Sequence, residues 1–133
     1  MSTRTIKLDD VQAIPLPKGS WSKKLLTRET VGAQKCMLGV SNFKPGTVTS
    51  LLVHEEEELA YVLAGRGKIR LKERDVPYQS GEGIYIPAGV PHAVVNDGEE
   101  EVVMVFTFSY PDYPPTQKID SEAPRPQGGA SGK

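Results

Sequence analysis

The stretch GEGIYIPAGVPHAVVN at residues 81–96 decides the fold. Glycine and proline end each short apolar run, so the pattern predicts a strand at Gly83–Ile86, a turn at Pro87–Gly89 and a second strand at His92–Asn96. Short strands divided by such turns are typical of β-sandwiches and β-barrels rather than of helical domains. His92 therefore opens a strand, directly after a turn that two prolines restrict.

The same alternation of short apolar runs and turns continues over most of the chain. The 133 residues include 13 glycines and 11 prolines, which divide the sequence into pieces too short for most helices. The further strands that we expect are Lys35–Asn42, Val48–His54, Glu58–Leu63, Gly67–Lys72 and Glu101–Ser109. The pattern therefore predicts an all-β domain.

The length of the chain predicts one domain, whose two ends differ from its middle. We expect residues 35–110 to form the core of the barrel. Residues 1–34 carry a sparse apolar pattern and are expected to add a strand or arm that packs on this core. Residues 111–133 form a C-terminal tail rich in proline and glycine, which predicts a wrapping segment over Pro111–Pro115 and a mobile end over the last dozen residues.

Composition and charge exclude several classes of protein. Sixteen Lys and Arg against seventeen Asp and Glu leave a net charge of -1, which provides no basic surface for DNA or RNA. No apolar run is long enough to span a membrane, and the first ten residues lack the apolar core of a secretory signal. The single cysteine, Cys36, cannot form an internal disulfide. We therefore expect a cytoplasmic protein that binds neither nucleic acid nor membrane.

The two histidines of the chain, His54 and His92, lie at expected strand ends, and Glu58 follows the first of them closely. Imidazole and carboxylate are ligands of zinc, iron, manganese and nickel, and a barrel can bring together ligands that are distant in sequence. Taken alone, two histidines near turns are equally compatible with surface positions that bind nothing.

The residues around the histidines form two spaced motifs. The first, G-x5-L-x-H-x3-E-x6-G, runs from Gly46 to Gly65 and contains His54 and Glu58. The second, G-x5-P-x-G-x2-H-x3-N, is the stretch at residues 81–96.

The two motifs closely resemble the signature motifs of the cupin superfamily, over roughly residues 35–109. The resemblance implies a double-sheet jelly-roll β-barrel with a ligand or metal pocket inside it. In that family the motif residues bind a divalent metal, which here implies His54, Glu58 and His92 as ligands. One histidine of the family's first motif is replaced by Leu52. The sequence does not distinguish Fe, Mn, Zn or Ni as the metal.

Three functions are open for such a barrel. Two histidines and one carboxylate are the ligand set of non-haem Fe(II) enzymes, which favours a dioxygenase acting on a small molecule. A metal-assisted isomerase, cyclase or lyase is the first alternative, because a metal also stabilises an enolate. The second alternative is a non-catalytic barrel that binds a small ligand and has lost its metal together with the histidine at position 52.

Side chains at strand spacing supply candidates for the pocket wall, although packing in the core explains the same pattern. These candidates are Leu52, Tyr61, Met104, Phe106 and Phe108. No residue is marked by the sequence as the catalytic acid or base.

We also expect a homodimer. Cupin barrels commonly pair, and a small barrel with exposed sheet edges is stabilised by covering one of them. The segment before Trp21 is expected to reach the partner, and Trp21 itself is expected either at the mouth of the barrel or at the dimer seam.

Overall fold

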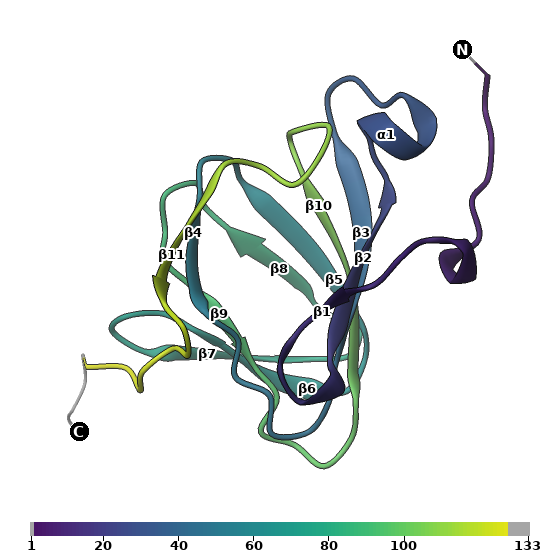
Figure 1. Cartoon of the computed structure of the whole chain (residues 1–133). Coiled ribbons are helices and arrows are strands. Elements are labelled where there is room, and N and C mark those ends of the chain that lie inside the picture. The colour runs from purple at the N-terminus through teal and green to yellow at the C-terminus, as the bar shows by residue number, and fades with distance from the viewer. Residues whose placement is uncertain (1, 128–133) are drawn as a thin grey trace.

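The structure, a computed structural model, describes residues 2–127 and consists mainly of β-strands (Figure 1). The strands are β1 (Ile14–Pro15), β2 (Trp21–Leu26), β3 (Met37–Phe43), β4 (Leu51–His54), β5 (Glu58–Ala64), β6 (Arg66–Arg70), β7 (Asp75–Gln79), β8 (Gly83–Ile86), β9 (Ala93–Val95), β10 (Val102–Phe108) and β11 (Thr116–Asp120). The helix α1 (Arg28–Val31) and two 3-10 turns, Leu8–Asp10 and Pro17–Gly19, complete the regular structure of these residues. No helix within residues 2–127 has the length and apolar character needed to cross a membrane.

The strands form a jelly-roll barrel of two facing sheets (Figure 1). One sheet has six strands in the order β1-β2-β3-β10-β5-β8. The opposite face consists of the three-stranded sheet β7-β6-β9 and the two-stranded sheet β11-β4. Isolated bridges from Leu52 to His92 and from Val48 to Val95 join these two pieces. The all-β, double-sheet fold predicted from the sequence is therefore confirmed.

Alternate side chains of the long strands fill the space between the sheets. In β10 every second residue from Val102 to Phe108 is buried, and the strand pairs with β3 on one side and β5 on the other. The ring of Phe106 lies directly on β3 because Gly39 has no side chain, and a Cβ at this position would collide with the ring. This close packing holds β3, β10 and β5 together as the rigid wall of the barrel.

Most expected strands are present, and β8 has the predicted bounds, but β2, β7 and β11 were missed. In β2 the inward-facing Ser22 and Lys24 are polar, so the strand shows no apolar alternation. β7 contains Pro77, which lacks a backbone N–H, and an edge strand tolerates this because one side of its backbone has no partner strand.

The C-terminal region is more ordered than a tail. β11 pairs with β4, Ala123 is buried, and the N–H of Gln127 donates to the carbonyl of Lys72 at 2.8 Å. The pairing supplies partners to backbone groups that β4 would otherwise leave at an open edge. The last part of the predicted tail, Gly128–Lys133, lies outside the described residues.

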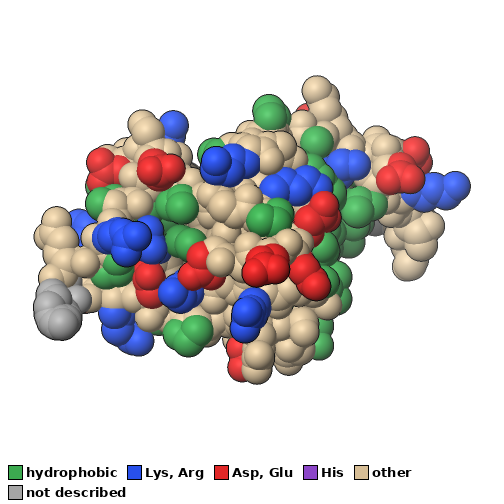
Figure 2. Space-filling view, turned by 90° about the horizontal axis from the view of Figure 1, so that it is seen from below, with side chains coloured by type: hydrophobic (Ala, Val, Ile, Leu, Met, Phe, Trp, Pro, Cys, Tyr) green, Lys and Arg blue, Asp and Glu red, His purple; other side chains and the backbone are tan. Residues whose placement is uncertain are grey.

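The end of the barrel seen in Figure 2 carries basic and acidic side chains next to one another, and no histidine is visible on it. Among the described ion pairs, Lys68 binds Asp97 at 2.9 Å and Arg70 binds Asp75 at 3.0 Å. The face in Figure 2 therefore has no surface of a single charge.

Candidate metal centre

The three side chains expected as ligands come from three strand ends. His54 is the last residue of β4, Glu58 is the first residue of β5, and His92 directly precedes β9. The N–H of Gly89 donates to the carbonyl of His54 at 2.9 Å, which holds the turn before β9 against the end of β4. Both faces of the barrel thus contribute to one site, because β5 lies in the sheet opposite β4 and β9.

These three residues, called the metal triad below, converge on one point. Oε1 of Glu58 lies 3.5 Å from Nε2 of His54 and 3.3 Å from Nε2 of His92. The side chains of the two histidines are 3% and 7% exposed, and that of Glu58 is 16% exposed. All three ligand atoms lie within 4.8 Å of one another, so the group could hold one metal ion.

Hydrogen bonds fix the tautomer of each imidazole ring. Nδ1 of His92 lies 2.9 Å from the carbonyl oxygen of Val90, which only accepts, so Nδ1 carries the hydrogen. Nδ1 of His54 lies 2.8 Å from Oγ1 of Thr116. That hydroxyl donates its own hydrogen to the carbonyl of Pro114 at 2.8 Å, so Nδ1 is again the donor. In both rings Nε2 is left with a lone pair toward the other ligands.

The chemistry of this donor set fits a divalent metal. Burial, and secondly the nearby His92 ring, lower the pKa of His54 from 6.5 to about 4, so its ring is neutral at neutral pH. Two nitrogen lone pairs and a carboxylate oxygen then face one another in a largely buried place. A cation satisfies such a set, and imidazole that donates through its other nitrogen is the usual form of a metal-binding histidine.

A cavity of about 100 Å³ lies beside the metal triad. Its wall includes Leu52, Met104 and Phe106, three of the residues expected there. Leu52 lies two residues before His54 on the same side of β4, so a histidine at this position would also face the cavity. Among the described residues that line the cavity there is no lysine or arginine.

Two residues expected in the wall lie elsewhere. Phe108 packs its ring edge against His54, with the ring centroids 4.8 Å apart, and belongs to the core instead of the cavity wall. Tyr61 is 50% exposed on the outer face of the six-stranded sheet. Successive side chains of a strand point to opposite faces, so Tyr61 points away from the side that Glu58 occupies.

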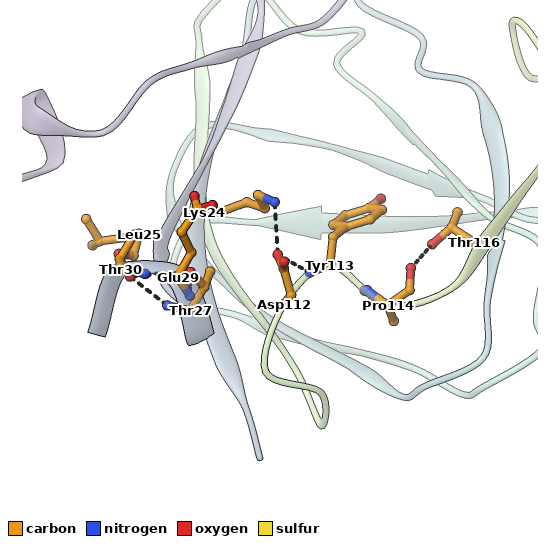
Figure 3. Close-up of polar contacts among 9 residues, drawn as sticks. All are labelled: Lys24, Leu25, Thr27, Glu29, Thr30, Asp112, Tyr113, Pro114 and Thr116. Carbon is orange, nitrogen blue, oxygen red and sulfur yellow. Dashed lines mark hydrogen bonds and ion pairs between the residues drawn. The ribbon is translucent and has the colours of Figure 1, made fainter. Parts of the chain in front are cut away.

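Tyr113 lines the cavity and was not identified from the sequence, where it belongs to the predicted wrapping segment. Its ring lies edge-on to His54 and to Phe108, with centroid distances of 5.4 Å in both cases. Figure 3 shows this ring beside Asp112, which Lys24 of β2 holds at 2.9 Å. Burial, and secondly the charge of Glu58, raise the pKa of the Tyr113 phenol.

The cupin family model, described as a cupin domain, matches residues 39–108, more than half of the chain. The chain belongs to the cupin family. Among curated proteins, this cupin is 35% identical over 109 residues to the polyketide synthase CurC of Streptomyces cyaneus, covering 80% of this chain and 71% of that protein. Among solved structures, it matches the polyketide cyclase RemF of Streptomyces resistomycificus with a TM-score of 0.75 and 26% identity, over 89% of this chain and 86% of that one.

A second kind of relative is the oxalate decarboxylase OxdC of Bacillus subtilis, which is 27% identical to this cupin over 119 residues. The match covers 84% of this chain but 31% of that protein. The relatives therefore include proteins that share one fold but are named for two different chemistries. The choice between these chemistries depends on the residues of the site.

Proposed function

We propose that this cupin is a metal-dependent enzyme that closes or isomerises a ring in a small substrate of the polyketide type. The observation that carries the proposal is the convergence of three ligand atoms, two of them held in place by hydrogen bonds at the far side of their rings. The names of CurC and RemF, whose matches cover most of their lengths, support the substrate type.

The metal triad would hold the metal ion. When bound, a divalent ion acts as a Lewis acid that polarises a carbonyl group and stabilises an enolate. The protein holds the ligand tautomers and keeps water from most of the site through Leu52, Met104 and Phe106. Fe, Mn, Zn and Ni all suit this ligand set, and a solved structure of the Bacillus subtilis oxalate decarboxylase is described as having Mn(II) centres.

The charges that line the cavity favour a substrate that is neutral in solution and loses one proton on binding, so that it carries a single negative charge in the site. A divalent ion beside one carboxylate leaves one positive charge, which the enolate of a β-diketone balances. Oxalate carries two negative charges, and the described wall of the cavity offers no basic side chain for the second. This balance of charges favours a substrate of the polyketide type over oxalate.

The cavity has room for only the reacting part of such a substrate. Its volume is about 100 Å³, less than the roughly 150 Å³ of a cavity that binds benzene in another protein. A β-dicarbonyl unit fits this space, while the rest of a polyketide chain would extend through the mouth. Tyr113 marks that mouth, because it lines the cavity and is also 39% exposed.

A dioxygenase, the function that the ligand set alone favours, is the second candidate. A linear β-triketone, offered as substrate, distinguishes the cyclase from the dioxygenase. Closing its ring with loss of water gives a dihydroxytoluene and consumes no oxygen. We expect metal-dependent formation of this ring in wild type, its loss in His92→Ala, and wild-type rates in Glu57→Ala, whose carboxylate bonds to Tyr85 instead. Oxygen uptake with cleavage of the carbon chain would show the dioxygenase and overturn the proposal.

We further propose a homodimer that pairs the outer face of the six-stranded sheet. Leu59, Tyr61 and Leu63 of β5 and Tyr85 of β8 are each at least 50% exposed on this face. Half-buried Val105 of β10 lies directly beside Tyr61 in the same sheet. Contiguous apolar patches of this kind are rare on monomers, and a two-fold axis through a flat sheet face buries the same patch twice.

The cytoplasm remains the proposed location. Cys36 is free and exposed, and no second cysteine exists to pair with it. A lone accessible thiol is stable in a reducing compartment.

A further inference from the structure

The segment that carries Tyr113 is fixed on both sides of that residue. The N–H of Arg28 donates to the carbonyl of Pro111 at 2.7 Å, and the N–H of Tyr113 donates to Oδ1 of Asp112 at 2.7 Å. On the other side, the N–H of Glu55 donates to the carbonyl of Pro115 at 3.1 Å. The backbone on both sides of Tyr113 is therefore fixed to the barrel, and Figure 3 shows the ring between Asp112 and Pro114 of this segment.

The hydroxyl of Tyr113 differs from the other hydroxyls around the cavity. Ser22 and Ser41 bond to each other at 2.6 Å, Thr49 accepts from the N–H of Val94, and Ser50 donates to the carbonyl of Ser121. Outside the cavity, Tyr78 donates to the carbonyl of Val95 and Tyr85 to Glu57, whereas no hydroxyl hydrogen bond is found for Tyr61 or Tyr110 among the described residues. Within the described part of the chain, no hydrogen bond is found for the Tyr113 hydroxyl.

A phenol is not needed for packing at this position. The ring contacts of Tyr113 with His54 and Phe108 are edge-to-face contacts, which phenylalanine would make equally well. Tyr113 lines the cavity and is 39% exposed at its mouth, so its hydroxyl is accessible to a molecule that enters there. Such a molecule meets a hydrogen-bond donor that the described part of the fold does not itself use.

We propose that the Tyr113 hydroxyl donates a hydrogen bond to a carbonyl or enolate oxygen of the substrate, beside the metal triad. This inference rests on the proposed function. It makes Tyr113 a further catalytic residue, because a donor to this oxygen stabilises the negative charge that forms there in the enolate. The Tyr113 hydroxyl is a neutral donor. It would take the position at which a site for dicarboxylates needs a basic side chain.

Acetylacetone, which consists of the β-dicarbonyl unit with a methyl group at each end, tests the role with cobalt-loaded protein. Binding is followed by the visible spectrum of the cobalt ion. We expect Tyr113→Phe to keep its cobalt and to bind acetylacetone about ten-fold more weakly than wild type, as for a lost hydrogen bond to a charged oxygen. Tyr110→Phe is the matched control, because Tyr110 packs on Met37 and Phe108 outside the cavity.

Imidazole as a second probe separates hydrogen bonding from packing, since it binds cobalt through nitrogen and offers no oxygen. We expect equal imidazole affinities for wild type and Tyr113→Phe. Equal acetylacetone affinities, or an equal weakening of both probes, would overturn the role of Tyr113 while leaving the metal triad intact. Failure of wild type to bind cobalt, or acetylacetone binding that ignores cobalt, would instead overturn the proposed function together with this role.

Discussion

The two faces of β5 differ in what they do, although the strand, ELAYVLA, is apolar on both. The inner face presents Glu58 to the metal triad, Ala60 to the cavity and Val62, with no exposed surface, to the core. The outer face presents Leu59, Tyr61 and Leu63, each at least half exposed. One strand therefore serves a buried polar site with one side and an uncovered apolar surface with the other. On each face one feature departs from the burial that hydrophobicity predicts: largely buried Glu58 on the inner face and the exposed apolar side chains on the outer face.

The largest difference between the two faces is expected in metal affinity. Glu58→Gln removes the anionic ligand while keeping the shape of the side chain, so the affinity for zinc should fall roughly a thousand-fold. Leu59→Ala, one residue further on the opposite face, should leave the affinity unchanged. Competition with a chromophoric chelator measures both. Unchanged zinc affinity in Glu58→Gln would remove Glu58 from the ligand set.

His54, which lies on β4 and faces Glu58 of the inner face, should also make the metal-free protein sensitive to acid. The pKa of His54 is 6.5 when unfolded and about 4 in the fold, so between these values the unfolded chain binds the additional proton. Stability is therefore complete above about pH 6.5 and falls as the pH drops toward 4, by on the order of 3 kcal/mol. Urea unfolding of the chelator-treated protein measures the slope. The His54→Gln variant should lack the part of the pH dependence of stability that comes from His54. An identical slope in wild type and variant would contradict the assignment of this pH dependence to His54.

The outer face should control assembly instead of stability. Tyr61→Glu places two like charges across the proposed two-fold interface, so the dimer should dissociate about a hundred-fold more readily with little change in the stability of the monomer. Gln117→Glu adds the same charge on β11 in the opposite sheet and is the control. Sedimentation across a concentration series measures the dissociation. A wild-type monomer at high micromolar concentration would show that the face has another role.

The smallest effect is expected from Thr116, whose side chain contacts Nδ1 of His54 on the side of the ring away from the other ligands. Thr116→Val keeps the shape but removes the acceptor that fixes the tautomer, so zinc affinity should fall about ten-fold. Thr107→Val, the same exchange on β10, should have no effect. Equal affinities in both variants would show that the tautomer is set without Thr116.

The elements and ligands that the sequence predicts are those defined by local spacing. β8 was predicted because a glycine-containing turn and Pro87 bound it, and His54, Glu58 and His92 were identified because the motifs repeat a family pattern. Thr116 and Tyr113 escape such reasoning. The contact of Thr116 with His54 joins residues 62 apart, and no periodicity records it. Tyr61 illustrates the opposite limit, because in a strand that is apolar on both faces the pattern cannot say which side is buried.

The pairing of β11 with β4 has a consequence for the order in which the site is assembled during synthesis. All three proposed ligands have been made once residue 92 is joined, but the group that orients His54 and the ring at the mouth come from residues 116 and 113. A ribosome-bound chain that ends between residues 92 and 113 contains His54, Glu58 and His92. It still lacks Thr116, which fixes the tautomer of His54, and Tyr113 at the mouth of the cavity. Because a domain of this size folds as a unit, the expected metal centre is complete only once β11, the last strand of the described residues, has paired with β4.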